Sequence, residues 1–318
     1  MSPSARRREV GRGERVLPGL WRLRLPLPWP GIPHCNAWAI AAGDGIVLVD
    51  TGMHQPGSLA HLERALDQVG LRLEHVRLIV LTHAHVDHCG QAPPIAERAG
   101  CEVWLHARHE HATGSPEERL ARRAEVARHS GVPEAAVRRW LAEHADDEPG
   151  QAGVLRMDRP LTDGVTVTTD LGDWRVVETP GHAPSHACLW QPERRLLLSG
   201  DHLLGRISLY FDHGYTPDPV GEFLASLDRV DALDVRLCLS GHGRTFTDVK
   251  GHIEANRALV REQVDQVRTA LAEGARTPYE VARRVYGDAF AEGSATWLLT
   301  MALCWLTHIE RLDAPGSA

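Results

Sequence analysis

The chain has 318 residues and a formal net charge of −7, with 43% hydrophobic and 24% charged residues. This size fits one large α/β domain with an appendage, and the composition is that of an ordinary globular protein. The acidic balance disfavours a general nucleic-acid-binding protein, because such proteins are usually basic.

No stretch of the sequence has the pattern of a targeting or membrane segment. Residues 2–16 are charged and lack the apolar core of a signal peptide. The most apolar predicted helix, over residues 295–306, is far too short to span a bilayer. The sequence therefore predicts a cytoplasmic protein that does not enter a membrane.

The first third of the chain predicts a β-rich half-domain. Alternating or β-branched apolar runs predict strands over residues 17–27, 36–41, 45–49, 76–81 and 102–105. Apolar residues at helical spacing predict helices over residues 57–69 and 92–98.

A cluster of histidines follows the strand predicted over residues 76–81. His83, His85, Asp87 and His88 form the pattern His-x-His-x-Asp-His within six residues. Open α/β sheets place their sites at the carboxyl ends of strands, and imidazole and carboxylate groups are natural zinc ligands. On an extended loop the first two histidines share one ion, while Asp87 and His88 turn toward a second.

Residues 107–150 interrupt the alternation of strands and helices. Charged segments with helical spacing cover residues 108–112, 116–129 and 133–145. An insertion at a metal-bearing edge is typical of a lid over a substrate pocket, and the alternative is a solvated excursion with no substrate contact. Five histidines in this segment or directly before it have no ligand motif and are predicted to be surface residues: His106, His109, His111, His129 and His144.

In the second half of the chain, predicted strands again end in polar motifs. Strands are predicted over residues 165–169, 174–178, 187–190, 195–199 and 235–240. Helices are predicted over residues 219–230, 248–272, from Pro278 with Thr277 as N-cap, and 293–312. The motifs at the strand ends are Thr-Pro-Gly-His at 179–182, Ser-Gly-Asp-His at 199–202 and Ser-Gly-His-Gly at 240–243.

These four motifs, in this order, resemble the hydrolases of the metallo-β-lactamase fold over residues 16–250. The resemblance implies an α/β fold, a four-layer αββα sandwich over residues 1–250 with the helical insertion at 107–150. Residues 251–318 are similar to the helical, winged-helix-like appendage of some members. We expect this tail to support packing or a homodimer rather than bind DNA, because Arg283 and Arg284 are its only basic pair.

The resemblance also implies a dinuclear site with two Zn²⁺ ions, for which iron or manganese is an alternative. Its expected ligands are His83, His85 and His182 for one ion, Asp87, His88 and His242 for the other, and Asp201 as the bridge. Two divalent ions make a bridging hydroxide available near neutral pH, and we expect Asp87 to orient it and accept its proton.

Further residues around this site carry weaker predictions. Asp50 is expected to support the metals from beneath, and the hydroxyl of Tyr210 or Tyr215 to assist the oxyanion. Cys89 and Cys188 adjoin ligand motifs but have no paired base, so we expect buried structural thiols. Three other polar residues lie near the motifs. We expect His186 to support a ligand from beneath and His202 to be a structural residue. Asp212 lies outside every motif, and we expect it to have little role.

The predicted activity is hydrolysis of an ester-like bond in a small-molecule acyl or lactone substrate, with a thioester favoured. A lactonase or a β-lactamase-like hydrolase is the first alternative, although Asp201 argues against true β-lactamases, which lack the bridging aspartate. A metal-dependent endoribonuclease is the second, and the net charge of −7 disfavours it. A redox role of the flavodiiron type would need a flavin domain, for which 318 residues leave no room.

Overall fold

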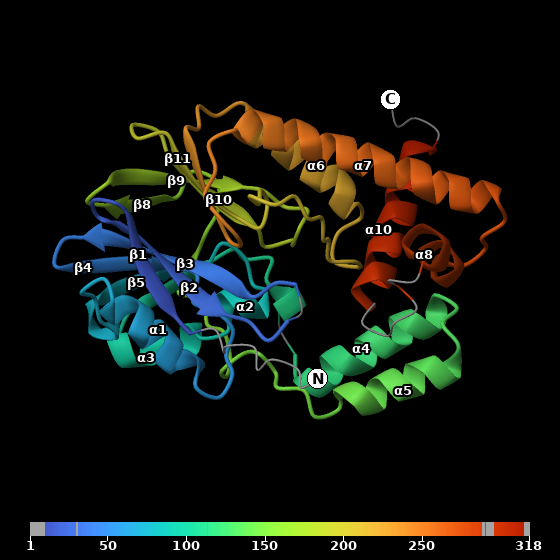
Figure 1. Ribbon diagram of the computed structural model, residues 1–318, viewed down its shortest axis with the longest axis horizontal. Helices are drawn as coiled ribbons and strands as arrows, with labels where there is room; N and C mark the ends of the chain where they lie inside the picture. The colour runs from blue at the N-terminus through green and yellow to red at the C-terminus, as the bar shows by residue number, and fades with distance from the viewer. Residues whose placement is uncertain (1–9, 30, 113, 288–289, 291–295, 315–318) are drawn as a thin grey trace, which may run out of the picture.

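The computed structural model describes residues 10–29, 31–112, 114–287, 290 and 296–314. Two β-sheets lie face to face and helices cover their outer sides, which gives four layers (Figure 1). Apolar residues of both sheets fill the space between them, among them Trp38 of the first and Trp174 of the second. The predicted αββα sandwich is confirmed.

The first sheet has seven strands in sequence order. They are β1 (Arg12–Leu17), β2 (Leu20–Pro26), β3 (His34–Ala42), β4 (Gly45–Val49), β5 (Val76–Val80), β6 (Glu102–Leu105) and β7 (Arg159–Pro160). Strands β1 to β4 pair antiparallel and β4 to β7 parallel. The sequence predicted one strand over 17–27. The chain instead turns at Gly19, which has φ 80°, so that β1 folds back on β2.

The second sheet has five strands in the order β12-β11-β10-β9-β8. They are β8 (Thr166–Thr169), β9 (Gly172–Glu178), β10 (Ala187–Gln191), β11 (Leu196–Gly200) and β12 (Leu237–Ser240). Only β11 and β12 pair parallel. These strands match the predicted ones to within a few residues, because each is a short apolar run bounded by turn residues.

Helices occupy both outer layers and the right side of Figure 1. They are α1 (Ser58–Asp67), α2 (Val86–Cys89), α3 (Ala92–Ala99), α4 (Pro116–His129), α5 (Glu134–His144), α6 (Pro219–Asp231), α7 (Val249–Ala272), α8 (Pro278–Tyr286) and α10 (Thr296–Leu312), with short 3₁₀ turns η1 (Leu73–His75) and η2 (Glu110–Ala112). Thr277 caps α8 as predicted, since its side chain accepts a hydrogen bond from the Glu280 N–H. The helix predicted over 293–312 begins in residues outside the described ones.

The insertion is part of a folded core rather than a solvated excursion. Ala124 and Ala127 of α4 and Val137 of α5 are buried in the same cluster as Trp305 of α10. Helix α4 packs against both α5 and α10, which fixes its position beside the C-terminal helices (Figure 1). Across the described ranges, no helix is long and apolar enough to cross a membrane.

Candidate metal centre

The histidine motif spans a change of backbone conformation at the end of β5. His85 is extended, with φ −71° and ψ 146°, and α2 begins at the next residue. His83 and His85 therefore lie on extended chain, while Asp87 and His88 lie on a helical turn. The turn redirects the second pair of side chains, which is what the spacing of the motif predicted.

Residues from four strand ends converge beside this turn. Potential ligand atoms lie within 4.8 Å of one another in the groups His83/His85/His182, Asp87/His88/His242 and His83/His88/Asp201. Nε2 of His182 lies 3.0 Å from Nδ1 of His85, and Nε2 of His88 lies 3.3 Å from Nε2 of His242. The structure thus brings together all seven residues that the motifs singled out.

Asp201 lies between two groups of ligands. The first group is His83, His85 and His182, and the second is Asp87, His88 and His242. Its carboxylate oxygens are 3.1 Å from Nε2 of His242 and 3.4 Å from Nε2 of His88 in one group. They are 3.7 Å from Nε2 of His182 in the other group. One carboxylate that reaches both groups can join two cations.

Two buried polar atoms in this cluster have no hydrogen-bond partner among the described residues: Nε2 of His83 and Oδ1 of Asp201. An unsatisfied buried acceptor costs about 1–3 kcal/mol, so proteins rarely leave one without a reason. An imidazole nitrogen and a carboxylate oxygen are both typical ligand atoms for zinc. The residues present therefore fit a divalent metal ion.

The charges of the site couple its carboxylates to its imidazoles. Burial raises the carboxyl pKa, but the neighbouring His88 and His242 outweigh it and lower the pKa of Asp87 and Asp201. Burial lowers the imidazole pKa, but Asp201 and Asp87 outweigh it and raise the pKa of His242 to about 10. Burial and the other imidazoles hold the pKa of His83 well below its usual value. Cations that replaced the imidazole protons would balance the same carboxylates.

Asp50 holds the second group of ligands from beneath. It is one of the non-glycine residues with positive φ, at 60°, a conformation that proteins retain mostly at functional positions. Its Oδ2 lies 2.9 Å from Nδ1 of His88, and its Oδ1 accepts the N–H of Thr82 at 2.8 Å. This orients His88 with Nε2 toward the site, as expected of a carboxylate behind a metal-binding histidine.

The other histidines of the site are also fixed through their second nitrogen. Nδ1 of His242 lies 2.9 Å from the carbonyl of His34, and Nδ1 of His182 lies 3.0 Å from that of Tyr210. His186 contacts Oγ1 of Thr179 at 2.8 Å and accepts the N–H of Asp201 at 3.1 Å. His186 thus ties two ligand loops together.

The expectation that Asp212 has little role is wrong. Its Oδ2 lies 2.9 Å from Nε2 of His85 and 3.3 Å from Nδ1 of His111, and its Oδ1 accepts the hydroxyl of Tyr210 at 3.3 Å. His85, His111 and Asp212 even form a further group with metal-ligand geometry. The sequence could have suggested such a residue through the rule that a metal-binding histidine hydrogen-bonds a second group with its other ring nitrogen. It did not indicate which aspartate would be that group.

The surface assignment fails for two of the five insertion histidines. His106 is 7% exposed and lies 3.1 Å from Oε1 of Glu178. His111 lies 2.8 Å from Oγ of Ser185, which also accepts the N–H of Ala84 inside the His-x-His motif. The turn at η2 directs this part of the chain toward the candidate metal centre. The sequence around these histidines has no ligand motif, so it gave no sign of this.

The two tyrosines predicted to assist catalysis lie near the first group of ligands. The ring of Tyr210 is 5.7 Å from the rings of both His85 and His182. The ring of Tyr215 is 5.8 Å from that of His111, and its hydroxyl accepts a hydrogen bond from Arg122 at 2.9 Å. Helix α4 therefore contacts this edge of the site through Tyr215.

Buried thiols beside the ligands are inert by their environment. Burial raises the pKa of Cys89 to about 12 and that of Cys188 to about 12. A thiol that stays protonated is a poor nucleophile. The prediction of structural thiols agrees with this environment. His202 is likewise buried, with its ring 5.1 Å from that of Phe223.

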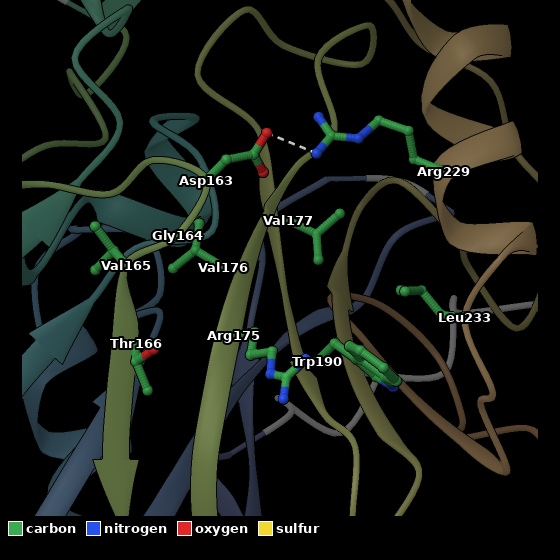
Figure 2. Close-up of a pocket in the computed structure, with 10 residues that line it drawn as sticks. All are labelled: Asp163, Gly164, Val165, Thr166, Arg175, Val176, Val177, Trp190, Arg229 and Leu233. Carbon is green, nitrogen blue, oxygen red and sulfur yellow. Dashed lines mark hydrogen bonds and ion pairs between the residues drawn. The ribbon is translucent and has the colours of Figure 1, made fainter.

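A separate hollow of about 470 Å³ lies beside β8, β9 and α6. Figure 2 shows Asp163 reaching Arg229 across its rim, an ion pair of 2.6 Å. None of the residues of the metal-ligand groups lines it. Asp163 is thus paired with Arg229, and Arg175 lies over the ring of Trp190, so this hollow has no catalytic arrangement comparable with the histidine cluster.

A four-layer αββα sandwich with histidine and aspartate clusters at its strand ends defines a metal-binding α/β protein of hydrolase type. The family model described as "Metallo-beta-lactamase superfamily" matches residues 30–242, and the chain belongs to this superfamily.

Relatives that match most of this chain support this assignment. The chain is 25% identical over 291 residues to the "Probable metallo-hydrolase YqjP" of Bacillus subtilis (strain 168), covering 86% of each protein. It is 25% identical over 275 residues to the "Atrochrysone carboxyl ACP thioesterase" of Claviceps purpurea, covering 83% of this chain and 71% of that protein. A metallo-beta-lactamase family protein from Thermus thermophilus has a similar structure, with TM-score 0.79, 28% identity and coverage of 94% of this chain and 96% of that one.

Proposed function

We propose that this protein is a dinuclear zinc-dependent hydrolase that cleaves an ester-like bond, preferably a thioester. The observation that carries the proposal is Asp201, a carboxylate with a 9% exposed side chain that lies within 3.1–3.7 Å of imidazole nitrogens from both ligand groups. A carboxylate in this position suits two cations rather than one.

The proposed ligands follow from the two groups. His83, His85 and His182 would hold the first ion, Asp87, His88 and His242 would hold the second, and Asp201 would serve both. Imidazole and carboxylate donors suit zinc, and they also suit iron or manganese. We propose zinc because the donor set is rich in imidazole nitrogen.

When bound, two divalent ions lower the pKa of a shared water and polarise the substrate carbonyl. Asp87 is the proposed proton acceptor: its Oδ2 lies 3.2 Å from Nε2 of His242 and it is almost completely buried. The lowered pKa keeps the Asp87 carboxylate ionised, so that it can accept a hydrogen bond from a water and orient it.

The geometry favours Tyr215 over Tyr210 as the group that assists the oxyanion. The hydroxyl proton of Tyr210 is donated to Asp212. The Tyr215 oxygen accepts a hydrogen bond from Arg122, which leaves its own proton free to donate to a substrate oxygen. Tyr210 then serves to position Asp212.

Two observations support an acyl substrate. One relative is named as a thioesterase that acts on an acyl-carrier substrate. The loop between β2 and β3 exposes Trp29 at 36% and Ile32 at 42%, and the loop leads to His34, whose carbonyl contacts His242. Exposed apolar side chains beside a polar centre suit an acyl chain. A lactonase remains the second candidate, because the same site chemistry opens a cyclic ester.

A substrate panel tests the proposal. Zinc-loaded protein is assayed on acetyl-CoA, S-lactoylglutathione, an acyl-homoserine lactone, nitrocefin and a structured RNA. We expect the highest kcat/KM on a thioester, and loss of that activity after treatment with a chelator. Activity confined to the lactone, nitrocefin or RNA would replace the thioesterase assignment by the corresponding alternative.

A further inference from the structure

One face of α4 carries three arginines at the edge of the metal centre: Arg119, Arg122 and Arg123. Arg122 and Arg123 follow Arg119 by three and four residues, so the three side chains share one side of the helix. The adjoining side bears Ala124 and Ala127, which are buried against the C-terminal helices. This packing fixes the rotation of α4 about its own axis and therefore the direction of the arginine face.

None of the three arginines has a carboxylate partner in the part of the chain that the structure describes. Arg119 is half-buried and donates to the carbonyls of Gly114 at 2.8 Å and Pro149 at 3.4 Å. Arg122 donates to the Tyr215 hydroxyl, and Arg123 is exposed. By contrast, Arg128 on the same helix pairs with Glu134 at 2.9 Å.

The unpaired charges of the arginine face repel one another. Burial and the charge of Arg123 lower the pKa of Arg119. Arg119 and Arg123 are like charges four residues apart on one helix, a spacing at which they repel each other. An anion that bridges the guanidinium groups would remove the repulsion.

The arginine face is linked to the metal centre through Tyr215. Arg122 contacts Tyr215, which packs on His111, and His111 shares Asp212 with His85. The arginine face thus borders the first ligand group through Arg122 and Tyr215.

We propose that the arginine face binds a phosphate group on the leaving thiol of the substrate, so that the preferred substrate is a thioester of a phosphorylated thiol. This rests on the proposed thioesterase function. Guanidinium groups recognise phosphate with paired hydrogen bonds, and three of them suit a phosphate better than a single carboxylate. The acyl chain then lies toward the apolar loop and the phosphate toward α4.

Point substitutions test this better than deletion of the insertion, because Ala124 and Ala127 belong to the core. Arg123→Gln and the double variant Arg122→Gln/Arg123→Gln are compared with Arg139→Gln. Arg139 is an exposed arginine of α5 in the same insertion, outside the arginine face. The substrates are acetyl-CoA, whose thiol carries phosphates, S-acetyl-N-acetylcysteamine, which has the same bond without phosphate, and S-succinyl-N-acetylcysteamine, whose carboxylate is on the acyl side.

We expect Arg123→Gln to raise KM for acetyl-CoA about tenfold, the effect of losing one charge-assisted contact, with kcat unchanged. The double variant should raise KM for acetyl-CoA further, and it should also lower kcat on every thioester because Arg122 donates to the Tyr215 hydroxyl. In Arg123→Gln the KM for both cysteamine thioesters, and in Arg139→Gln all constants, should stay at the wild-type values. A higher KM for the succinyl thioester alone would assign the arginine face to an acyl carboxylate and overturn the phosphate assignment.

A binding experiment separates failure of this inference from failure of the proposed function. S-ethyl-CoA, a thioether that cannot be hydrolysed, is titrated into metal-loaded protein by calorimetry. A Kd that rises about tenfold in Arg123→Gln supports the arginine face even if no thioester is hydrolysed. An unchanged Kd, or no binding to the wild-type protein, rejects the arginine face, although thioester hydrolysis would still support the proposed function.

Discussion

The carboxylate of Asp212 lies 2.9 Å from Nε2 of His85, on the opposite side of the ring from Nδ1, which faces His182 at 3.0 Å. The two residues are 127 positions apart in the chain. Asp212 therefore fixes the tautomer and orientation in which His85 offers Nδ1 to the site. It is a positioning residue for a proposed ligand.

We predict that Asp212→Asn lowers metal affinity or activity about 10–100-fold, the usual effect of changing the partner of a metal-binding histidine. The cause is the loss of a charged acceptor for the Nε2 proton of His85. The measurements are zinc affinity by competition with a chelator and the absorption spectrum of the cobalt-loaded protein. Asp147→Asn, an exposed aspartate of the insertion, is the control. Wild-type affinity and spectrum in Asp212→Asn would contradict the positioning role.

Metal content is the next expectation. Protein purified without chelator should contain about two transition-metal ions per chain, as two-metal hydrolases require. Removal of the metal should abolish activity and lower the unfolding temperature, because ligands that bind only the folded state stabilise it. Elemental analysis and thermal unfolding measure both effects. Full activity with one tightly bound ion would contradict the bridging role proposed for Asp201.

Asp201→Asn should reduce kcat by roughly 10²–10⁴, the range expected for loss of one main electrostatic group. The substitution keeps the size of the side chain but removes its charge, so the second metal should bind more weakly. The remaining site should need a higher pH for activity. Metal content and the pH profile of kcat measure this, again with Asp147→Asn as control. A variant with the wild-type rate, metal content and pH profile would disprove the bridge.

Trp305 anchors the site loop from α10. It is fully buried, its Nε1 donates to the Tyr286 hydroxyl at 3.0 Å, and its ring is 5.4 Å from that of Phe211, the residue before Asp212. Trp305→Ala should lower the free energy of unfolding by about 3–5 kcal/mol and also lower kcat. Trp297→Ala removes a 48% exposed ring from the same helix and should have an effect of about 0.5 kcal/mol or less. Equal effects in denaturant unfolding would contradict this assignment.

Asp218 couples stability to pH. Its carboxylate accepts the N–H of Gly221 at 2.9 Å and lies 2.9 Å from Nδ1 of His308 on α10. Burial opposes the shift, but these contacts lower the pKa of Asp218. A lowered folded pKa adds stability above the unfolded pKa of about 4, and this contribution is lost as the pH falls through the folded value. Asp218→Asn should therefore be less stable than wild type at pH 7, with the difference vanishing in strong acid. A pH-independent difference in denaturant unfolding would contradict this linkage.

The prediction from sequence succeeded where the information is local. Short apolar or alternating runs predicted β8 to β12 to within a few positions, and the Thr277-Pro278 pair predicted the start of α8. The resemblance of the four motifs to a known family also indicated the seven residues that converge at the candidate metal centre. The strands and the start of α8 depend on neighbours within a few residues, because backbone periodicity and turn chemistry act over that range.

Tertiary structure alone decided which distant side chains support the site. His111 looked like a surface residue and Asp212 like a spare loop aspartate, yet the fold places their side chains 3.3 Å apart beside His85. Arg122 reaches Tyr215 across 93 positions of the chain. These contacts depend on how α4 and the loop after β11 pack against α10. No periodicity records that packing, because many sequences with the same local pattern could bury the same apolar faces in another arrangement.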